Sequence, residues 1–234
     1  MEDDLKELVS RLKIAHSGTL VSIIVYGSAI AAPGNVRKAD CHLMVLTRVL
    51  TAEELRAARP IAKWWVGQGY ALPVYFTQDE FLQSLDVFAI EFRHMKRAYR
   101  VLHGQDLLAT NEASKANLRM QIEYELRGKL LRLRSLYLPS SESVESLTRL
   151  MTDSIYSFVQ FMRPILELVG EEPPLSRLAT VRRLSEYLAL DLSPLEQILR
   201  LREEDEPLTE MGAHELFAKY LDCLTNVIAA VNNL

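Results

Sequence analysis

The sequence has little of the residue types that mark special structural classes. Its 234 residues include two cysteines, nine glycines and nine prolines. The cysteines, Cys41 and Cys223, are far apart and lack the spacing of metal ligands, so we expect neither a disulfide framework nor a zinc site. Both lie in apolar runs and are interpreted as buried free thiols. The small content of glycine and proline excludes a low-complexity or disordered chain.

Long apolar runs and a large net charge are also lacking. No stretch approaches the roughly 18 apolar residues of a membrane span. The acidic, amphipathic beginning of the sequence, MEDDLKELVSRLKIA, does not resemble a signal peptide. We therefore expect a cytoplasmic protein without a membrane partner. The net charge of −4 gives no overall signal for nucleic-acid binding, so nucleic acid is not an expected partner.

The first third of the chain alternates between helix and strand patterns. Residues 3–16 carry apolar side chains at helical spacing, and Thr51 with Glu54 forms a capping-box pattern that starts a helix running to about residue 66. The predicted strands are short apolar runs at residues 20–26, 41–47 and 72–77. This alternation predicts an α/β domain.

The remainder of the chain is predicted to be helical. Strand patterns stop after about residue 87, and residues 88–102 are expected to form a helix. Further helices are predicted at 115–138, at 143–169, at 175–189, from Ser193 onward, and at 210–232. We therefore predict two domains, an α/β domain over residues 1–110 and an all-α helical bundle over residues 111–234.

One segment of the α/β domain has features that suggest chemistry. The apolar strand 20–26 leads into Gly27-Ser28, and about a dozen residues later Asp40 opens the next predicted strand. A glycine at a strand end lets the backbone approach a phosphate closely, and a serine with nearby backbone N–H groups can hold phosphate oxygens. Residues at i and i+2 on a strand point to the same face, so two acids at this spacing can share divalent cations.

This order of features resembles the nucleotidyltransferase superfamily, in particular its small bacterial and kanamycin-type members. Their pattern is an apolar strand, Gly-Ser, a short helix and an Asp-x-Asp motif that opens the next strand. The resemblance implies an N-terminal nucleotidyltransferase fold with a mixed sheet. It assigns nucleotide binding to Gly27 and Ser28, catalysis to Asp40 and His42, and metal binding to Asp40. It also implies a nucleoside triphosphate substrate and, for an active enzyme, Mg²⁺ or Mn²⁺.

The chain departs from this pattern at the second aspartate. His42 stands there, and Cys41 between the two positions is expected to face the core. Magnesium prefers oxygen ligands and binds imidazole poorly. Members of the superfamily take a third carboxylate from a neighbouring strand, but the predicted strand 72–77 carries none, and Asp79 and Glu80 follow its end. One carboxylate of three is therefore identified.

A second stretch of resemblance lies downstream. Residues 97–106, Arg-Ala-Tyr-Arg-Val-Leu-His-Gly-Gln-Asp, are similar to the segment that closes the catalytic domain in this superfamily. The helix that follows is similar to the one that opens the superfamily's helical domain, from which kanamycin-type enzymes take a glutamate as general base. Glu123 and Glu125 are the candidates for that role here.

The sequence leaves three functions open. The first, which we favour because Asp40 lacks a partner acid at position 42, is a catalytically impaired nucleotidyltransferase-fold protein with a nucleotide-binding or regulatory role. The second is an active enzyme that moves a nucleoside monophosphate from a triphosphate to a hydroxyl, with His42 and one of the acids named above completing the site. The third is a protein-interaction module, such as half of a toxin–antitoxin-like pair or a homodimer.

Overall fold

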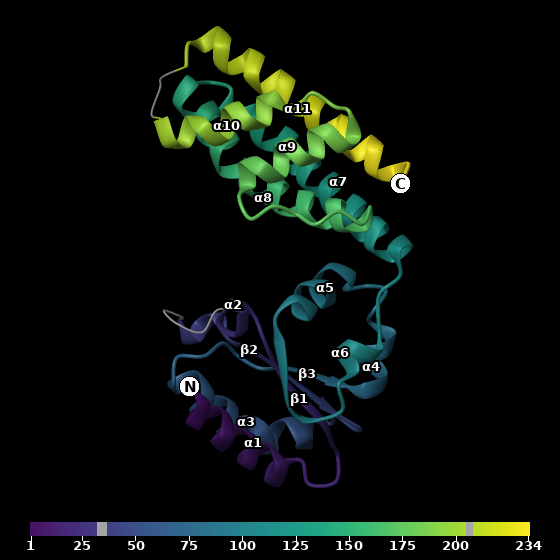
Figure 1. Cartoon of the computed structure of the whole chain (residues 1–234). Helices are drawn as coiled ribbons and strands as arrows, with labels where there is room; N and C mark the ends of the chain where they lie inside the picture. The colour runs from purple at the N-terminus through teal and green to yellow at the C-terminus, as the bar shows by residue number, and fades with distance from the viewer. Residues whose placement is uncertain (32–36, 205–207) are drawn as a thin grey trace. The chain divides into compact units, whose positions relative to one another are not determined.

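The computed structural model describes residues 1–31, 37–204 and 208–234. The chain divides into two compact units, Met1–Ser114 and Lys115–Leu234. The first unit contains a sheet with helices, and the second unit contains helices and no strand among its described residues (Figure 1). The predicted fold class, an α/β part followed by a helical part, is therefore confirmed.

The sheet of the first unit has four strands in the order β3-β2-β1-β4. The strands are β1 (Leu20–Tyr26), β2 (His42–Thr47), β3 (Val74–Thr77) and β4 (Tyr99–Gly104). β1 is antiparallel to both of its neighbours, whereas β2 and β3 are parallel. The sheet is therefore mixed, as predicted.

The strand β4 corrects the last part of the helix predicted over residues 88–102. The helix α5 (Ala89–Arg97) ends at Ala98, whose backbone is extended, and the chain then pairs with β1. β4 lies at the edge of the sheet and none of its residues is fully buried, so it lacks the clear apolar alternation of a half-buried strand. Pairing with β1 decides its conformation, and local sequence alone does not reveal such pairing.

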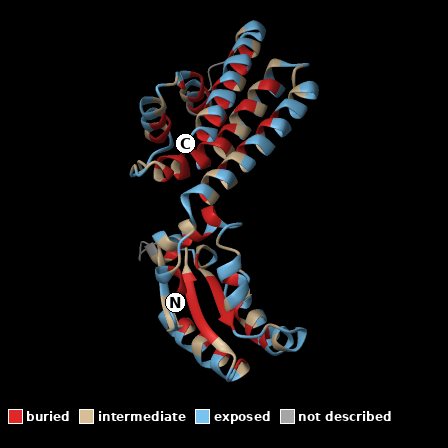
Figure 2. Cartoon of the chain, turned by 90° about the vertical axis from the view of Figure 1, so that its right-hand side faces the viewer, coloured by how far each residue is buried: buried red, intermediate tan, exposed pale blue. Residues whose placement is uncertain are grey.

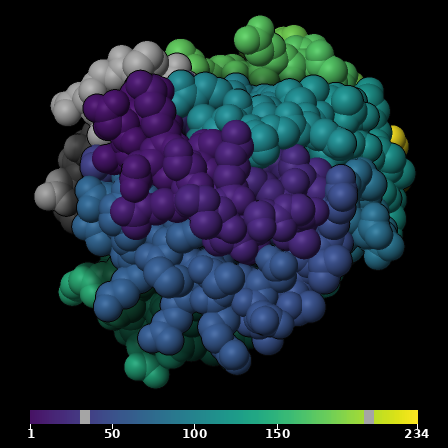
Figure 3. All heavy atoms as spheres, turned by 90° about the horizontal axis from the view of Figure 1, so that it is seen from below, coloured from purple at the N-terminus to yellow at the C-terminus, as the bar shows by residue number. Residues whose placement is uncertain are grey.

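Helices cover both faces of the sheet (Figure 1). On one face α1 (Glu2–Ala15) and α3 (Ala52–Gly67) lie side by side, as Figure 3 also shows. On the other face lie α4 (Gln78–Gln83), α5 and α6 (Leu107–Thr110), whose apolar side chains join a second buried cluster. The sheet is therefore the middle layer of three.

The two central strands contribute to both of these cores. Ile23, Val25 and Leu43 face the core under α1 and α3. Ile24 and Met44, one residue along, face the core under α4, α5 and α6. Because both faces are covered, β1 and β2 are continuous apolar runs and are drawn as buried along most of their length (Figure 2).

The second unit is a bundle of α-helices. In the part of the chain that the structure describes, these are α7 (Lys115–Ser140), α8 (Val144–Leu168), α9 (Arg177–Leu188), α10 (Ser193–Glu204) and α11 (Glu210–Asn232). α8 contacts each of the other four and carries the longest buried face. α7 continues through Pro139, where the sequence predicted a break, because a proline in the last turn removes one N–H donor only. Among the described helices none is long and apolar enough to cross a membrane.

Gly104 ends β4 where two chain segments cross closely. Its φ of 81° lies in the left-handed region, and a Cβ atom there would collide with the backbone carbonyl of Val21. We expect Gly104→Ala to lower the free energy of unfolding of the first unit by roughly 1–3 kcal/mol, because the backbone must shift to relieve the collision.

Gly67 provides the matched control in the same unit. Alanine at this position meets no atom within 4 Å, and the φ of Gly67 is not in the left-handed region. Gly67→Ala should leave the stability unchanged or raise it slightly. Urea unfolding followed by tryptophan fluorescence measures the free energy of unfolding of both variants, since both tryptophans, Trp64 and Trp65, lie in α3 of the first unit. Equal destabilisation by the two substitutions would contradict the prediction.

Candidate functional site

The end of β1 meets the start of β2 at Gly27. Tyr26 pairs with His42 across the two strands. Gly27 has a φ of 111°, and its N–H donates a hydrogen bond to the carbonyl of Ala98 at 3.0 Å. A Cβ atom on Gly27 would collide with the carbonyl oxygen of Asp40 and would lie 2.9 Å from Cδ2 of His42. The structure therefore brings three of the predicted residues, Gly27, Asp40 and His42, together.

Ser28 is the fourth predicted residue and begins the single-turn helix α2 (Ser28–Ala31). The N–H of Ile30 donates to the carbonyl of Gly27 at 2.9 Å, which closes the turn. The Ser28 side chain is exposed, and no described residue is hydrogen-bonded to its hydroxyl. This hydroxyl is therefore free to contact a ligand at the end of β1.

Asp40 lies just before β2 rather than on it. It ends the 3-10 helix η1 (Lys38–Asp40), and the next residue, Cys41, is fully buried as expected. The Asp40 carboxylate accepts hydrogen bonds from Arg37, at 3.2 Å from Nε and 3.4 Å from Nη2. The Arg37 side chain is 84% exposed, so this ion pair is a solvated surface contact. The predicted metal ligand therefore already has a cationic partner.

His42 stacks on a tyrosine. The rings of His42 and Tyr26 have centroids 5.3 Å apart and planes inclined by 27°. No described residue is hydrogen-bonded to the ring nitrogens of His42. Burial raises the pKa of the Tyr26 hydroxyl, which stays protonated at neutral pH. Position 42 therefore presents an imidazole stacked on an aromatic ring.

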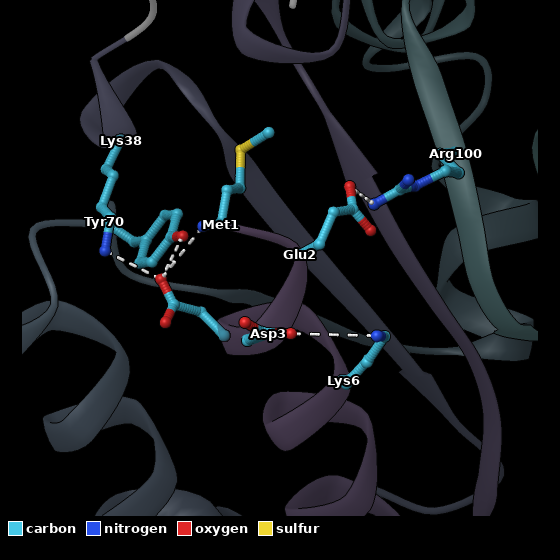
Figure 4. A network of polar contacts seen from close by, with 8 residues as sticks. Met1, Glu2, Asp3, Lys6, Lys38, Tyr70 and Arg100 are labelled. Carbon is cyan, nitrogen blue, oxygen red and sulfur yellow. Dashed lines mark hydrogen bonds and ion pairs between the residues drawn. The ribbon is translucent and has the colours of Figure 1, made fainter.

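A network of polar contacts holds η1 against α1 (Figure 4). Nζ of Lys38 lies 2.8 Å from the Asp4 carboxylate, and the Tyr70 hydroxyl donates to the same oxygen at 2.7 Å. The Lys38 ammonium also lies 5.0 Å from the centre of the Tyr70 ring, which stacks on Trp65 with 3.6 Å between centroids. The contacts with Lys38 and Tyr70 hold the pKa of Asp4 below its ordinary value. The segment that carries Asp40 is thereby fixed to the helix layer.

The acids that follow β3 lie at the opposite end of the sheet. β3 is parallel to β2, and its last residue, Thr77, pairs with the last residue of β2, whereas His42 is the first. Five residue steps along a strand span roughly 17 Å. Glu80 is also engaged locally, because its carboxylate accepts the N–H of Thr77 at 2.8 Å in a capping box. Asp79 and Glu80 therefore do not complete the candidate site.

The two glutamates considered as general base belong to the helical unit. The Glu123 carboxylate bridges two arginines of α7, with distances of 3.1 Å to Arg119 and 2.8 Å to Arg127. Glu125 is half-buried on the same helix. The role of either glutamate at the candidate site stays a prediction.

The donor set at Gly27 does not fit a pair of magnesium ions. Within the described residues, no three side chains of His, Cys, Asp or Glu come together as a metal site. The Asp40 carboxylate shares its charge with Arg37, and the imidazole of His42 is a poor ligand for Mg²⁺. Metal binding at Asp40 by Mg²⁺ or Mn²⁺, which the sequence pattern implied for an active enzyme, stays a prediction.

Two residues of the site were not among the sequence predictions, namely Tyr26 and Arg37. In the sequence Tyr26 is the last residue of an apolar strand, and its contact with His42 depends on strand register, which the sequence does not state. Arg37 stands three residues before Asp40, and this spacing was a usable signal for a local ion pair.

Comparisons with known proteins include a distant structural likeness. No protein-family model and no curated protein matches the chain. Among solved structures, a spectinomycin adenyltransferase from Enterococcus faecialis, crystallised with ATP and spectinomycin, covers 99% of this chain and 99% of its own. Its TM-score is 0.49 and its sequence identity is 14%. At these values the likeness carries no argument about fold or function, which rest on the elements described above.

The contact between Asp4 and Lys38 predicts a pH-dependent contribution to stability. Asp4→Asn should lower the free energy of unfolding at pH 7. The neutral amide loses the ion pair with Lys38, and its oxygen is a weaker acceptor for the hydrogen bond that the Tyr70 hydroxyl donates. Since the pKa of Asp4 is lowered in the folded state from 3.8, its contribution is complete above that pH and is lost as the pH falls further. The difference between wild type and variant should therefore shrink below about pH 4.

The matched control is Asp3→Asn, because Asp3 is 99% exposed and contacts only Lys6, at 3.8 Å, among the described residues. It should change the stability little at any pH. Urea unfolding at pH 7, 5 and 3 with tryptophan fluorescence measures both variants. A destabilisation by Asp4→Asn that is the same at pH 3 as at pH 7 would refute the assigned charge effect.

Proposed function

We propose that this chain is a nucleotidyltransferase-fold protein that binds the phosphate groups of a nucleotide at the Gly27 turn and lacks metal-dependent transfer activity. The observation that carries the proposal lies at position 42. An imidazole stacked on Tyr26 stands where a second metal-binding carboxylate is needed, and the first, Asp40, is paired with Arg37. Such a protein would act as a nucleotide-binding or regulatory module.

The groups around the Gly27 turn suit an anion. The hydroxyl of Ser28 beside Gly27 is exposed and has no partner among the described residues. The guanidinium of Arg37 is exposed, so it can exchange its solvated contact with Asp40 for a phosphate. A guanidinium matches phosphate geometry through two parallel hydrogen bonds. These features support phosphate binding without a metal ion.

The same groups do not support group transfer. Metal ions, where bound, would orient the triphosphate and polarise its phosphoryl oxygens. Two Mg²⁺ ions would bring about four positive charges to a site whose nearest carboxylate is already paired with an arginine. The acids after β3 lie at the other end of β2 and cannot offset this charge. The active-enzyme alternative therefore requires carboxylates that this end of the sheet does not supply.

An exposed apolar stripe on α7 favours the protein-interaction alternative. Met120, Tyr124, Leu131 and Leu138 have exposed fractions between 60% and 77%, and their spacings of four and seven residues place them on one helix face. Such a stripe is a common feature of surfaces that contact another protein. A homodimer or a partner protein on this face is compatible with nucleotide binding in the other unit.

We expect at least one of the four common nucleoside triphosphates to stabilise the chain equally in Mg²⁺ and in EDTA. At a ligand concentration of about 100 times Kd, the gain is about 2.7 kcal/mol, which a thermal-shift measurement detects. Arg37→Gln should reduce this shift. Arg59→Gln is the matched control, because Arg59 is an exposed arginine of α3 without an ion-pair partner among the described residues.

A transfer assay with labelled triphosphates completes this test. Labelled nucleoside monophosphate attached to an acceptor by the wild type, and lost in Asp40→Ala, would overturn the proposal in favour of an active enzyme. The absence of any shift with all four triphosphates would refute nucleotide binding. That result, together with a dimeric mass by light scattering, would favour the protein-interaction alternative.

Restoration of the second acid should improve metal binding. His42→Asp places a carboxylate beside Asp40, so we expect it to bind Mn²⁺ about tenfold more tightly than the wild type, a difference of about 1.4 kcal/mol. His42→Asn is the control, since it removes the ring without adding charge. Isothermal titration of the three proteins with Mn²⁺ measures the effect. Equal affinity of wild type and His42→Asp would show that position 42 does not limit metal binding.

A further inference from the structure

The helical unit contains a hollow that the nucleotide site does not involve. It lies between the second half of α7 and the first half of α8 and has a volume of about 540 Å³. Pockets that hold small organic molecules commonly measure roughly 300–1,000 Å³. The hollow is therefore large enough for such a ligand, and it lies within a single compact unit.

The hollow exists because α8 turns small side chains toward α7. Ser146, Ser154 and Ser157 line it at spacings of eight and three residues, which places them on neighbouring parts of one helix face. Leu133 and Leu136 line it from α7. Serines are too short to fill the space opposite these leucines, so the two helices leave a gap where larger side chains would interlock.

The floor of the hollow is apolar. Leu133 of α7 and Phe158 of α8 line it and are almost fully buried beneath it. Leu136 also lines it and stays 41% exposed, so part of its apolar surface faces the open space. A ligand with an apolar body would remove this surface from water, which stabilises the bound state by roughly 25 cal/mol per Å² of apolar area.

The rim of the hollow carries excess positive charge. Lys129, Arg132 and Arg149 line it, against one acid, Asp153. Arg132 has no ion-pair partner in the described part of the chain, and Lys129 lies over the Phe161 ring at 5.2 Å rather than against an acid.

Arg149, the third cation of the rim, has an exposed acidic neighbour, Glu145. Arg149 contacts Glu145 at 3.2 Å, with both side chains more than 70% exposed, so this pair offsets little of its charge. The rim can therefore hold an anionic group.

We propose that this hollow binds an amphipathic organic anion, with an apolar body on the leucine and phenylalanine floor and one carboxylate, sulfonate or phosphate group at the basic rim. Lys129 and Arg132 contact the anionic group. The hydroxyls of Ser154 and Ser157 donate to backbone carbonyls of α8, so their oxygens accept hydrogen bonds from a ligand. Asp153 accepts a hydrogen bond from a donor on the ligand or stays in solvent. The site is independent of the proposed nucleotide site, since it is built from residues of the helical unit alone.

The test uses two probes that share one aromatic body, on the full-length chain. 1-Anilinonaphthalene-8-sulfonate carries an anionic group, and N-phenyl-1-naphthylamine does not. We expect the sulfonate probe to bind saturably with one-to-one stoichiometry in a fluorescence titration. Arg132→Gln should weaken the sulfonate probe about threefold to tenfold and leave the neutral probe unchanged, because it removes charge from the rim only. Arg134→Gln, on the same helix but outside the hollow, should change neither.

Two filling substitutions test the location separately from the charge. Ser157→Leu and Ser146→Leu each place an apolar side chain in the hollow, so each should weaken both probes at least tenfold. Thermal unfolding of each variant shows whether it is folded, and the second variant serves if the first is not. Unchanged binding in a folded filling variant would overturn the proposal, as would equal effects of Arg132→Gln and Arg134→Gln on the sulfonate probe.

Discussion

The arrangement at the end of the sheet depends on one close approach of two backbone segments. Gly27 leaves β1 with a φ that favours glycine, and the carbonyl of Asp40 occupies the place where a Cβ atom would be. The N–H of Gly27 is at the same time bound to Ala98 before β4, so the turn joins three parts of the chain. The register of β1 and β2 beside this contact pairs Tyr26 with His42 and stacks their rings.

The charges of Asp40 and Arg37 determine which ligands suit the Gly27 turn. The structure fixes η1 through Lys38 and Asp4 and so places Asp40 firmly, but the carboxylate finds Arg37 rather than a second acid. An ion pair on the surface is weak and can be exchanged, whereas a missing carboxylate cannot be supplied by rearrangement. Phosphate binding at this turn stays a proposal, and that proposal does not require a metal ion.

In the helical unit, small side chains leave the hollow between α7 and α8, and basic side chains surround its opening. Serines on α8 face leucines on α7, and basic side chains stand at the opening. The two candidate sites thus differ in origin. One follows from a backbone crossing that excludes a side chain, and the other follows from side chains too small to fill a helix–helix contact.

Several features could be predicted because local sequence determines them. The apolar run of β1, the helix of α7 and the turn after Tyr26 are visible as patterns, and the order of Gly27, Ser28 and Asp40 indicated that they would form one site. The replacement of an acid by His42 is also plain from the sequence, and it is the basis of the proposed loss of transfer activity.

Other features depend on contacts between distant segments, which no local pattern states. β4 is a strand because it pairs with β1 at the sheet edge, and for that reason residues 99–102 were wrongly predicted to continue the helix that α5 forms. The parallel register of β3 sends Asp79 and Glu80 to the far end of β2. The sequence by itself determined which side chains are present at the candidate site, whereas the tertiary structure decided which of them meet, because register and packing act between residues that are far apart in the chain.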